Sequence, residues 1–207
     1  MVENAHPGVP ERTVFARMLE VYLELGGTFP TAFGWSTGPA GNMYHRIEQP
    51  TLRKVQAGDM LMPEIVGRYA GYWAQIDPTV AVGDVPQVFD DAHKLAVESF
   101  NRMVGAMKPG ARVGDLIEAG QVAALDGRLQ ARVGAHGRGL GDDGPLIVER
   151  VSAQEAELEL LEGVCLAVKP SVTLEGKEAS RFGDSVVVTA TGSRRLGTRS
   201  QAFMHAR

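Results

Sequence analysis

A histidine inside a glycine-rich loop is the first chemically suggestive feature of this sequence. The loop reads His136-Gly137-Arg138-Gly139-Leu140-Gly141, and the pair Asp142-Asp143 follows it. Glycines let a backbone approach a ligand closely, and an imidazole can bind or protonate a bound molecule. His136 and Arg138 are therefore candidates for binding a ligand. The alternatives are a buried histidine that hydrogen-bonds a backbone carbonyl, and charged loop residues that face solvent.

Helical and extended patterns mix irregularly around this loop. Apolar residues at helical spacing predict three helices, at Pro10 to Gly26, Pro86 to Met107 and about Asp115 to Leu125. Residues 59–82 are rich in strand-forming types, with Gly67 as the turn signal, and predict a hairpin. Further strands are predicted at 132–133, 166–172 and 185–189. Because strands and helices do not alternate strictly, the predicted fold class is α+β.

Length and composition favour one intracellular domain. The 207 residues include 44% hydrophobic side chains, enough for a sizeable core, so we expect residues 1–207 to form a single domain. A net charge of -4 without any basic run argues against nucleic acid as a partner. The sequence has no membrane-spanning apolar run and no hydrophobic signal core, and its lone Cys165 lies in an apolar stretch. We therefore expect a cytoplasmic setting and no membrane partner.

A longer pattern extends from the predicted hairpin to the last predicted strand. It opens with Gly58-Asp59, an apolar run, an acid, and Tyr69-Ala70-Gly71-Tyr72, and it ends with Arg181-Phe182-Gly183-Asp184. This pattern resembles the superfamily of creatinase, aminopeptidase P and methionine aminopeptidase, over about residues 10–198. The resemblance implies a pita-bread fold, which is a curved antiparallel sheet covered by helices. The first helix and the N-terminal domain of larger members are expected to be absent here.

Metallopeptidases of this superfamily hold two divalent ions with five side chains, namely Asp, Asp, His, Glu and Glu. By the resemblance, the matching positions here are Glu64, Gln75, His136, Lys169 and Gly183. A protonated lysine cannot coordinate a metal, glycine has no side chain, and glutamine offers only a neutral carbonyl. The resemblance therefore implies a dismantled metal site and no cofactor. In such a site the Lys169 ammonium would stand where a cation stood and would balance Glu64.

Further candidates follow from the same resemblance. His45 matches a pocket position that resembles the general acid/base histidine of creatinase, a metal-free member, with a surface imidazole as the alternative. Asp77 falls where creatinase carries a carboxylate that holds its substrate. Asp143 stands where the peptidases have a second loop histidine, which argues against a proline-peptidase substrate. Tyr72 is a candidate for binding substrate, although it is also typical of a core residue.

The main hypothesis is a metal-independent hydrolase or lyase that acts on a small polar molecule with a C–N bond. Its predicted catalytic residues are His45, His136, Glu64 and Lys169, and its predicted substrate-binding residues are Asp77, Gln75, Arg138, Asp143 and Tyr72. Glu64 and Lys169 also fit a purely structural ion pair. One alternative is a catalytically inactive pseudo-peptidase that serves as a binding domain, and a weaker one is a metallopeptidase with an unorthodox site. The expected partners are a small-molecule substrate and a second copy in a homodimer.

Overall fold

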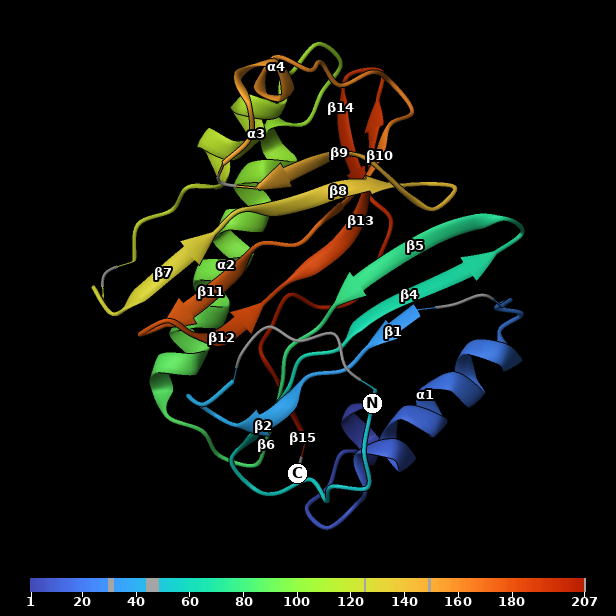
Figure 1. The fold of residues 1–207 in the computed structure, drawn as a ribbon, viewed down its shortest axis with the longest axis vertical. Helices are drawn as coiled ribbons and strands as arrows, with labels where there is room; N and C mark the ends of the chain where they lie inside the picture. The colour runs from blue at the N-terminus through green and yellow to red at the C-terminus, as the bar shows by residue number, and fades with distance from the viewer. Residues whose placement is uncertain (30–31, 44–48, 125, 149, 207) are drawn as a thin grey trace.

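A computed structural model describes residues 1–206 except 30–31, 44–48, 125 and 149 (Figure 1). Its helical elements are the short 3-10 helix η1 (Val2–Asn4), α1 (Glu11–Glu24), α2 (Gln87–Ala106), α3 (Val113–Gly120) and α4 (Ala153–Ala156). Within the described residues, no helix combines the length and the apolar character that crossing a membrane requires.

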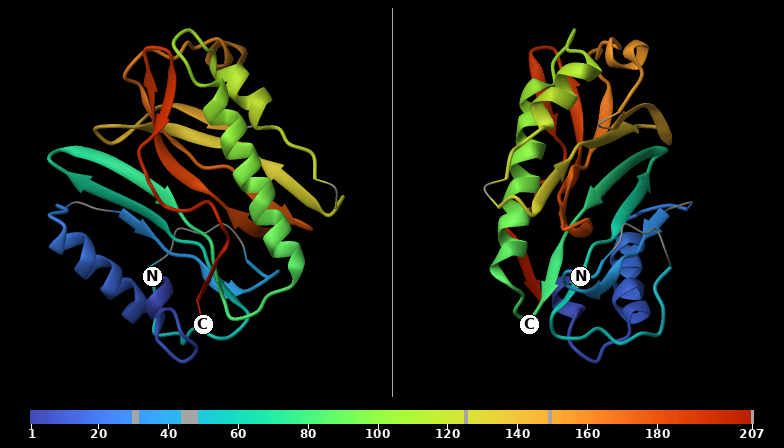
Figure 2. Two further views of the ribbon diagram at one scale, coloured as in Figure 1. Left: turned by 180° about the vertical axis from the view of Figure 1, so that it is seen from behind. Right: turned by 60° about the vertical axis from the view of Figure 1, so that its left-hand side comes forward.

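The strands form three sheets, and the largest has eight strands that pair antiparallel throughout. Along this sheet the order is β1 (Ala32–Gly34), β4 (Glu64–Tyr69), β5 (Tyr72–Asp77), β13 (Gly183–Thr189), β10 (Cys165–Val168), β8 (Gly134–Arg138) and β9 (Asp142–Val148), with β14 (Gly192–Arg195) beside β13. A second sheet contains β12 (Lys177–Arg181), β11 (Ser171–Leu174) and β7 (Leu129–Arg132). The third contains β15 (Met204–Ala206), β6 (Val80–Val82), β3 (Asp59–Leu61) and β2 (Thr37–Pro39). Figure 2 shows α2 lying across the back of the curved sheets.

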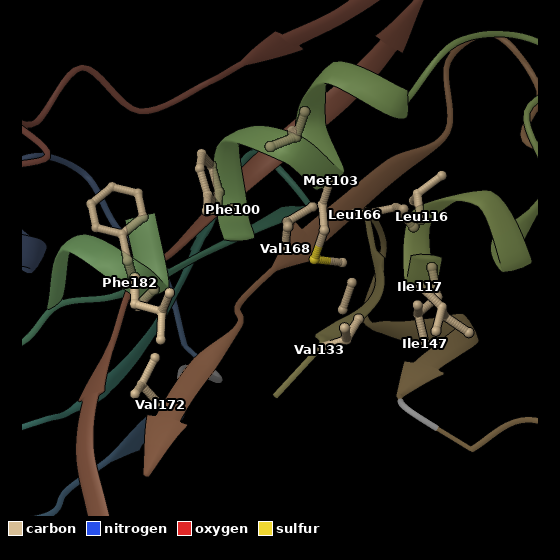
Figure 3. Close-up of a cluster of buried hydrophobic side chains, with 14 of the residues drawn as sticks. Phe100, Met103, Leu116, Ile117, Val133, Ile147, Leu166, Val168, Val172 and Phe182 are labelled. Carbon is tan, nitrogen blue, oxygen red and sulfur yellow. The ribbon is translucent and has the colours of Figure 1, made fainter. Parts of the chain in front are cut away.

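The main core lies between α2 and the sheets. Apolar residues at every third or fourth position bury one face of α2, including Phe100 and Met103. Figure 3 shows these side chains among the same cluster as Leu116 and Ile117 of α3 and Leu166 of β10. Burial of each such side chain contributes about 1.5–3 kcal/mol. A second, smaller cluster packs α1 against the sheet that contains β3, β6 and β15.

The predicted α+β class is confirmed, and the first two predicted helices end close to the expected residues, at Glu24 and Ala106. Gly26, two residues past the end of α1, adopts the positive φ that commonly follows a helix, at 84°. The third helix is shorter than predicted and ends at Gly120. The prediction that Gly67 forms the hairpin turn is wrong, because β4 continues through it and the chain turns at Ala70-Gly71. Gly67 instead makes room for a ring, since a Cβ there would lie 3.0 Å from Cε2 of Tyr22.

The two halves of the large sheet meet at β5 and β13 through only two register pairs, Gly183 with Asp77 and Asp184 with Ile76. Ser185 extends this short ladder with its side chain. Its Oγ accepts a hydrogen bond from the Gln75 amide at 2.8 Å and donates one to the Gln75 carbonyl at 3.3 Å. Buried backbone groups need such partners, so the hydroxyl replaces a missing rung of the ladder.

Ser185→Ala is therefore expected to lower the free energy of unfolding by about 1–3 kcal/mol, because the buried Gln75 amide loses its partner. Urea unfolding followed by circular dichroism measures the loss. Ser193→Ala is the matched control. Its hydroxyl donates to the Val104 carbonyl, which also accepts from the Met107 amide, so that carbonyl keeps a partner. Equal losses in the two variants would contradict the bridging role of Ser185.

Candidate active site

Side chains that can take part in acid–base chemistry or ligand binding come together from several strands at the β5–β13 junction. Side chains alternate between the two faces of a strand, so residues two apart point the same way. The gathered residues are Glu64 at the start of β4, Gln75 and Asp77 on β5, His136 and Arg138 on β8, Lys169 directly after β10 and Gly183 at the start of β13. The antiparallel order of the sheet thus joins residues that are more than 100 positions apart in the sequence.

An ion pair stands at the surface of this group. The Lys169 ammonium donates a hydrogen bond to Glu64 Oε2 at 2.9 Å, and about a quarter of the lysine side chain remains exposed. Burial alone would raise the pKa of Glu64, but the charge and hydrogen bond of Lys169 outweigh it. The pKa of Glu64 therefore lies below its ordinary value. Glu64 is an anion at neutral pH, and Lys169 neutralises it.

Gly183 has no room for a side chain in this arrangement. A Cβ at this position would lie 2.5 Å from Asp77 Oδ2 and 2.8 Å from Lys169 Cβ. Both separations are well inside van der Waals contact, so a larger residue would displace Asp77 or Lys169. Among the described residues, no three His, Cys, Asp or Glu side chains are grouped so that they could hold a metal ion.

Asp77 is the fully buried acid of the site. Its Oδ2 accepts a hydrogen bond from Gln75 Nε2 at 3.1 Å. Its Oδ1 has no hydrogen-bond partner among the described residues and lies 3.9 Å from Arg181 Nη1. Burial, followed by repulsion from Glu64, raises the pKa of Asp77 to about 6, against the attraction of Lys169 and Arg181. Asp77 therefore gains or loses its proton close to neutral pH.

Arg138 fixes the orientation of Gln75. Its Nη2 donates to Gln75 Oε1 at 2.5 Å, which leaves the Gln75 amide group to donate to Asp77. The same nitrogen forms an ion pair with Asp142 Oδ1 at 2.7 Å, and Nη1 donates to the Gly141 carbonyl. A continuous series of contacts therefore links the exposed Asp142 to the buried Asp77.

The contacts of His136 define its tautomer. Nδ1 lies 2.9 Å from the Gly137 carbonyl oxygen, which can only accept, so Nδ1 carries the proton and Nε2 keeps a lone pair. Burial lowers the pKa of His136, and the charges of Lys169 and Arg138 add to this, against the hydrogen bond to Gly137. The imidazole is neutral at neutral pH, and its Nε2 lone pair faces Arg138 Nη2 at 3.5 Å, which is the long end of a hydrogen bond. The backbone hydrogen bond and the pocket role are thus compatible.

Six of the predicted site residues lie together, namely Glu64, Gln75, Asp77, His136, Arg138 and Lys169. Asp143 lies on the surface, where its carboxylate accepts hydrogen bonds from the Gly139 and Leu140 amides and shapes the loop. Tyr72 occupies the opposite face of β5 from Gln75 and is 69% exposed, which corrects the alternative of a core position. His45 lies outside the described residues.

Arg199 adds a contact that no pattern in the sequence indicated. Its Nη2 donates to the Gly183 carbonyl at 2.6 Å and to the Asp77 carbonyl at 3.4 Å. The guanidinium also lies 4.0 Å from the centre of the Phe182 ring. Burial lowers the pKa of Arg199 to about 10, so it remains a cation at neutral pH. Arg199 therefore ties together the two strands of the junction.

Residues 1–190 match the model of metallopeptidase family M24, and the chain belongs to that family. Among curated proteins, it is 24% identical to the Xaa-Pro dipeptidase of Pyrococcus furiosus over 201 residues, which cover 94% of this chain and 56% of the relative. It is 26% identical to the creatinase of Bacillus sp. over 180 residues, which cover 84% of this chain and 43% of that relative. The chain thus spans about half the length of the curated relatives it matches.

A solved structure confirms the predicted pita-bread fold. The dipeptidase PepE from Mycobacterium ulcerans superposes with a TM-score of 0.80 at 24% sequence identity. The superposition covers 99% of this chain and 55% of that one. At this level of identity, the likeness establishes the architecture, and the chemistry of the site has to be argued from its own side chains.

Asp77→Asn is expected to stabilise the protein at pH 8. Because the folded pKa of Asp77 is raised, the folded state binds more protons than the unfolded state between about pH 4 and 6, and its stability falls as pH rises through this range. Above that range the wild type carries the full cost of a buried charge, about 1–3 kcal/mol at 1.36 kcal/mol per pKa unit. Asparagine removes the charge and keeps an oxygen for Gln75. Unfolding free energies measured from pH 4 to 8 should therefore converge at the acid end.

Asp184→Asn is the control for this measurement. Asp184 is also buried, but its carboxylate accepts from Arg195 Nε at 2.6 Å and from the Ser185 amide at 2.9 Å. Its neutralisation leaves Arg195 without its charged partner, so this variant should be less stable than the wild type at pH 8. A loss of stability at pH 8 in Asp77→Asn would show that Arg181 and Lys169 compensate the Asp77 charge fully.

Proposed function

We propose that this chain is a metal-independent hydrolase or lyase of the cytoplasm that acts on a small polar molecule with a C–N bond. The observation that carries the proposal is the space in front of Gly183, which Asp77 and Lys169 fill. A carboxylate from this position has no room, and the Lys169 ammonium already neutralises Glu64. The residues present therefore do not fit a pair of divalent ions. The relationship to a creatinase also supports a substrate other than a peptide.

His136, Lys169 and Asp77 have separate roles in the proposed reaction. His136 Nε2 removes a proton from water, and the water oxygen forms a bond to the carbon of the C–N group. Lys169 stabilises the negative charge that develops on the substrate. The C–N bond then breaks, and the proton passes from His136 to the leaving nitrogen. In a lyase, the same base removes a proton from the carbon next to the C–N bond, a carbon–carbon double bond forms as the C–N bond breaks, and the proton passes to the leaving nitrogen. Gln75 and Arg138 hold Asp77 behind these groups as a second site for a proton.

One observation favours a second candidate function, a binding domain without catalysis. Asp77 is fully buried, and Lys169 and Arg138 both pair with acids of the same chain. Such an arrangement is complete without a ligand. A substrate has to compete with these internal ion pairs for its own contacts. Of the six site residues that lie together in the described part of the chain, Lys169, Glu64 and His136 offer partly exposed surface to it. The two candidates differ in whether a bound molecule is converted.

Metal analysis provides the first test of the proposal. Protein that is freshly purified without any chelator should contain well below one metal ion per chain by mass spectrometry. Its unfolding temperature should not change on addition of manganese, cobalt or zinc, because a tightly bound ion would stabilise the folded state. Near-stoichiometric metal, or strong stabilisation by one of the three ions, would overturn the proposal.

His136→Gln tests the catalytic part. Small amides and amidines are screened for turnover with a chelator present, and the variant is compared with wild type on the best substrate. We expect turnover to fall about 100- to 10,000-fold, the range for loss of a general base, with an unchanged circular dichroism spectrum. His205→Gln, at an exposed position outside the site, is the control and should keep wild-type turnover. A compound that binds but is never converted would favour the binding domain.

A further inference from the structure

A groove of about 710 Å³ lies between the outer face of α2 and the chain segment that precedes β15. Figure 2 shows this segment, in red, running beside α2. The part of α2 that lines the groove extends from Asp90 to Arg102, which is about 18 Å of helix. Val97 and Ala202 add apolar surface to the walls. None of the described residues that line the groove belongs to the candidate active site, and its volume suits a small organic molecule.

The charged residues around this groove neutralise one another. Lys94 forms an ion pair with Asp90, one helical turn away. Arg102 forms an ion pair with Glu98 at 2.6 Å, again one turn away. His93 also lines the groove, and burial lowers its pKa, so its ring is neutral at neutral pH. The described lining residues therefore carry two cations and two anions, which favours an uncharged ligand over an anion or a cation.

One end of the groove is aromatic and is held in place by hydrogen bonds. The Phe203 ring stacks on the His93 ring, with the ring centroids 5.2 Å apart and an angle of 26° between the planes. His93 Nε2 donates to the Gln201 carbonyl at 3.1 Å, and Nδ1 accepts from the Ser180 hydroxyl at 3.0 Å. Phe203 lines the groove and is partly exposed, so its ring can pack against an aromatic ring of a ligand.

The other end of the groove carries two side-chain amides. Gln201 Nε2 donates to Asn101 Oδ1 at 2.8 Å, and Asn101 Nδ2 donates to Gln201 Oε1 at 3.4 Å. A side-chain amide has two N–H groups and two lone pairs on its oxygen, and this pairing uses one of each. In the described part of the chain, one N–H and one lone pair thus remain on each amide. A planar amide of a ligand, with a donor beside an acceptor, is complementary to these groups.

We propose that this groove binds an uncharged molecule that carries an aromatic ring at one end and a planar amide at the other. The ring packs on Phe203, and the amide exchanges hydrogen bonds with Asn101 and Gln201. This inference does not depend on the proposed catalytic function. The ligand contacts the same segment that carries Arg199, two residues before Gln201, to the β5–β13 junction.

N-acetyl-L-phenylalanine amide is the probe, because it is uncharged and combines one aromatic ring with planar amides. Two-dimensional ¹H–¹⁵N NMR of the 207-residue chain follows the side-chain amide signals of Asn101 and Gln201 as the probe is added. We expect both signals to shift with a dissociation constant of about 0.1–1 mM, in line with the affinity per atom of small ligands. N-acetyl-L-leucine amide lacks the ring, and N-acetyl-L-phenylalanine carries a carboxylate, so each should bind about 5-fold more weakly or worse.

Three variants of the groove locate the bound probe. Asn101→Ala and Gln201→Ala should each weaken binding about 5-fold, because each removes one of the two amides, and the remaining amide signal reports the binding. Ala202→Trp should abolish binding, because the larger side chain fills the groove. All three positions are at least partly exposed, so the variants should fold, and their unfolding temperatures establish this.

Gln121→Ala is the matched control, because it removes an exposed side-chain amide that does not line the groove. It should leave the dissociation constant unchanged. The proposal is wrong if neither amide signal shifts at probe concentrations up to about 20 mM, well above the expected dissociation constant. Equal affinity for N-acetyl-L-leucine amide, or affinity that all three groove variants leave unchanged, would overturn it as well.

Discussion

The packing of Asp77 and Lys169 against the Cα of Gly183 sets the distance between the two halves of the large sheet. β5 and β13 share only two register pairs, so there is little backbone ladder to hold them. The remaining links come from side chains, with Ser185 bridging to the Gln75 backbone and Arg199 donating to carbonyls on both strands. A side chain at position 183 would push the strands apart at this point. The geometry of every site residue on β5 therefore depends on one missing Cβ.

The same junction determines the electrostatics of the site. Lys169 pairs with Glu64, Arg138 with Asp142, and Arg181 with Glu178, so that each of these cations has an anionic partner close by. Asp77 has weaker compensation, because its nearest cation is 3.9 Å away and its surroundings exclude water. Burial therefore raises its pKa, while the surrounding cations and burial lower the pKa of His136. The pKa of Asp77 is thus shifted upward and that of His136 downward, which favours the protonated acid and the neutral imidazole.

Periodicity and motif spacing predict a large part of this fold. α1 and α2 follow from apolar residues that repeat along one helical face, because such a face has to be buried. The hairpin turn was misplaced because two glycines compete for it, and only the packing of Tyr22 shows that Gly67 belongs inside the strand. Because side chains alternate along a strand, the spacing of Tyr72 and Gln75 on β5 already indicates that they face opposite ways. The sequence motif that contains Tyr72 does not indicate this difference in orientation.

Sequence patterns predict some residues of the candidate site and miss others. Glu64, His136 and Lys169 were predicted because each keeps its place in a motif of fixed spacing. The contact between Arg138 and Gln75 spans 63 residues and depends on sheet order, and Arg199 arrives from a segment without regular structure. A sequence motif gives the position of a residue along the chain, but it does not give the packing of other side chains around that residue. For this reason the sequence shows only that position 183 is a glycine, whereas the structure shows that Asp77 and Lys169 fill the space that a side chain there would need. A carboxylate introduced at this one position would therefore displace Asp77 or Lys169, because the space that it needs is filled by those two side chains.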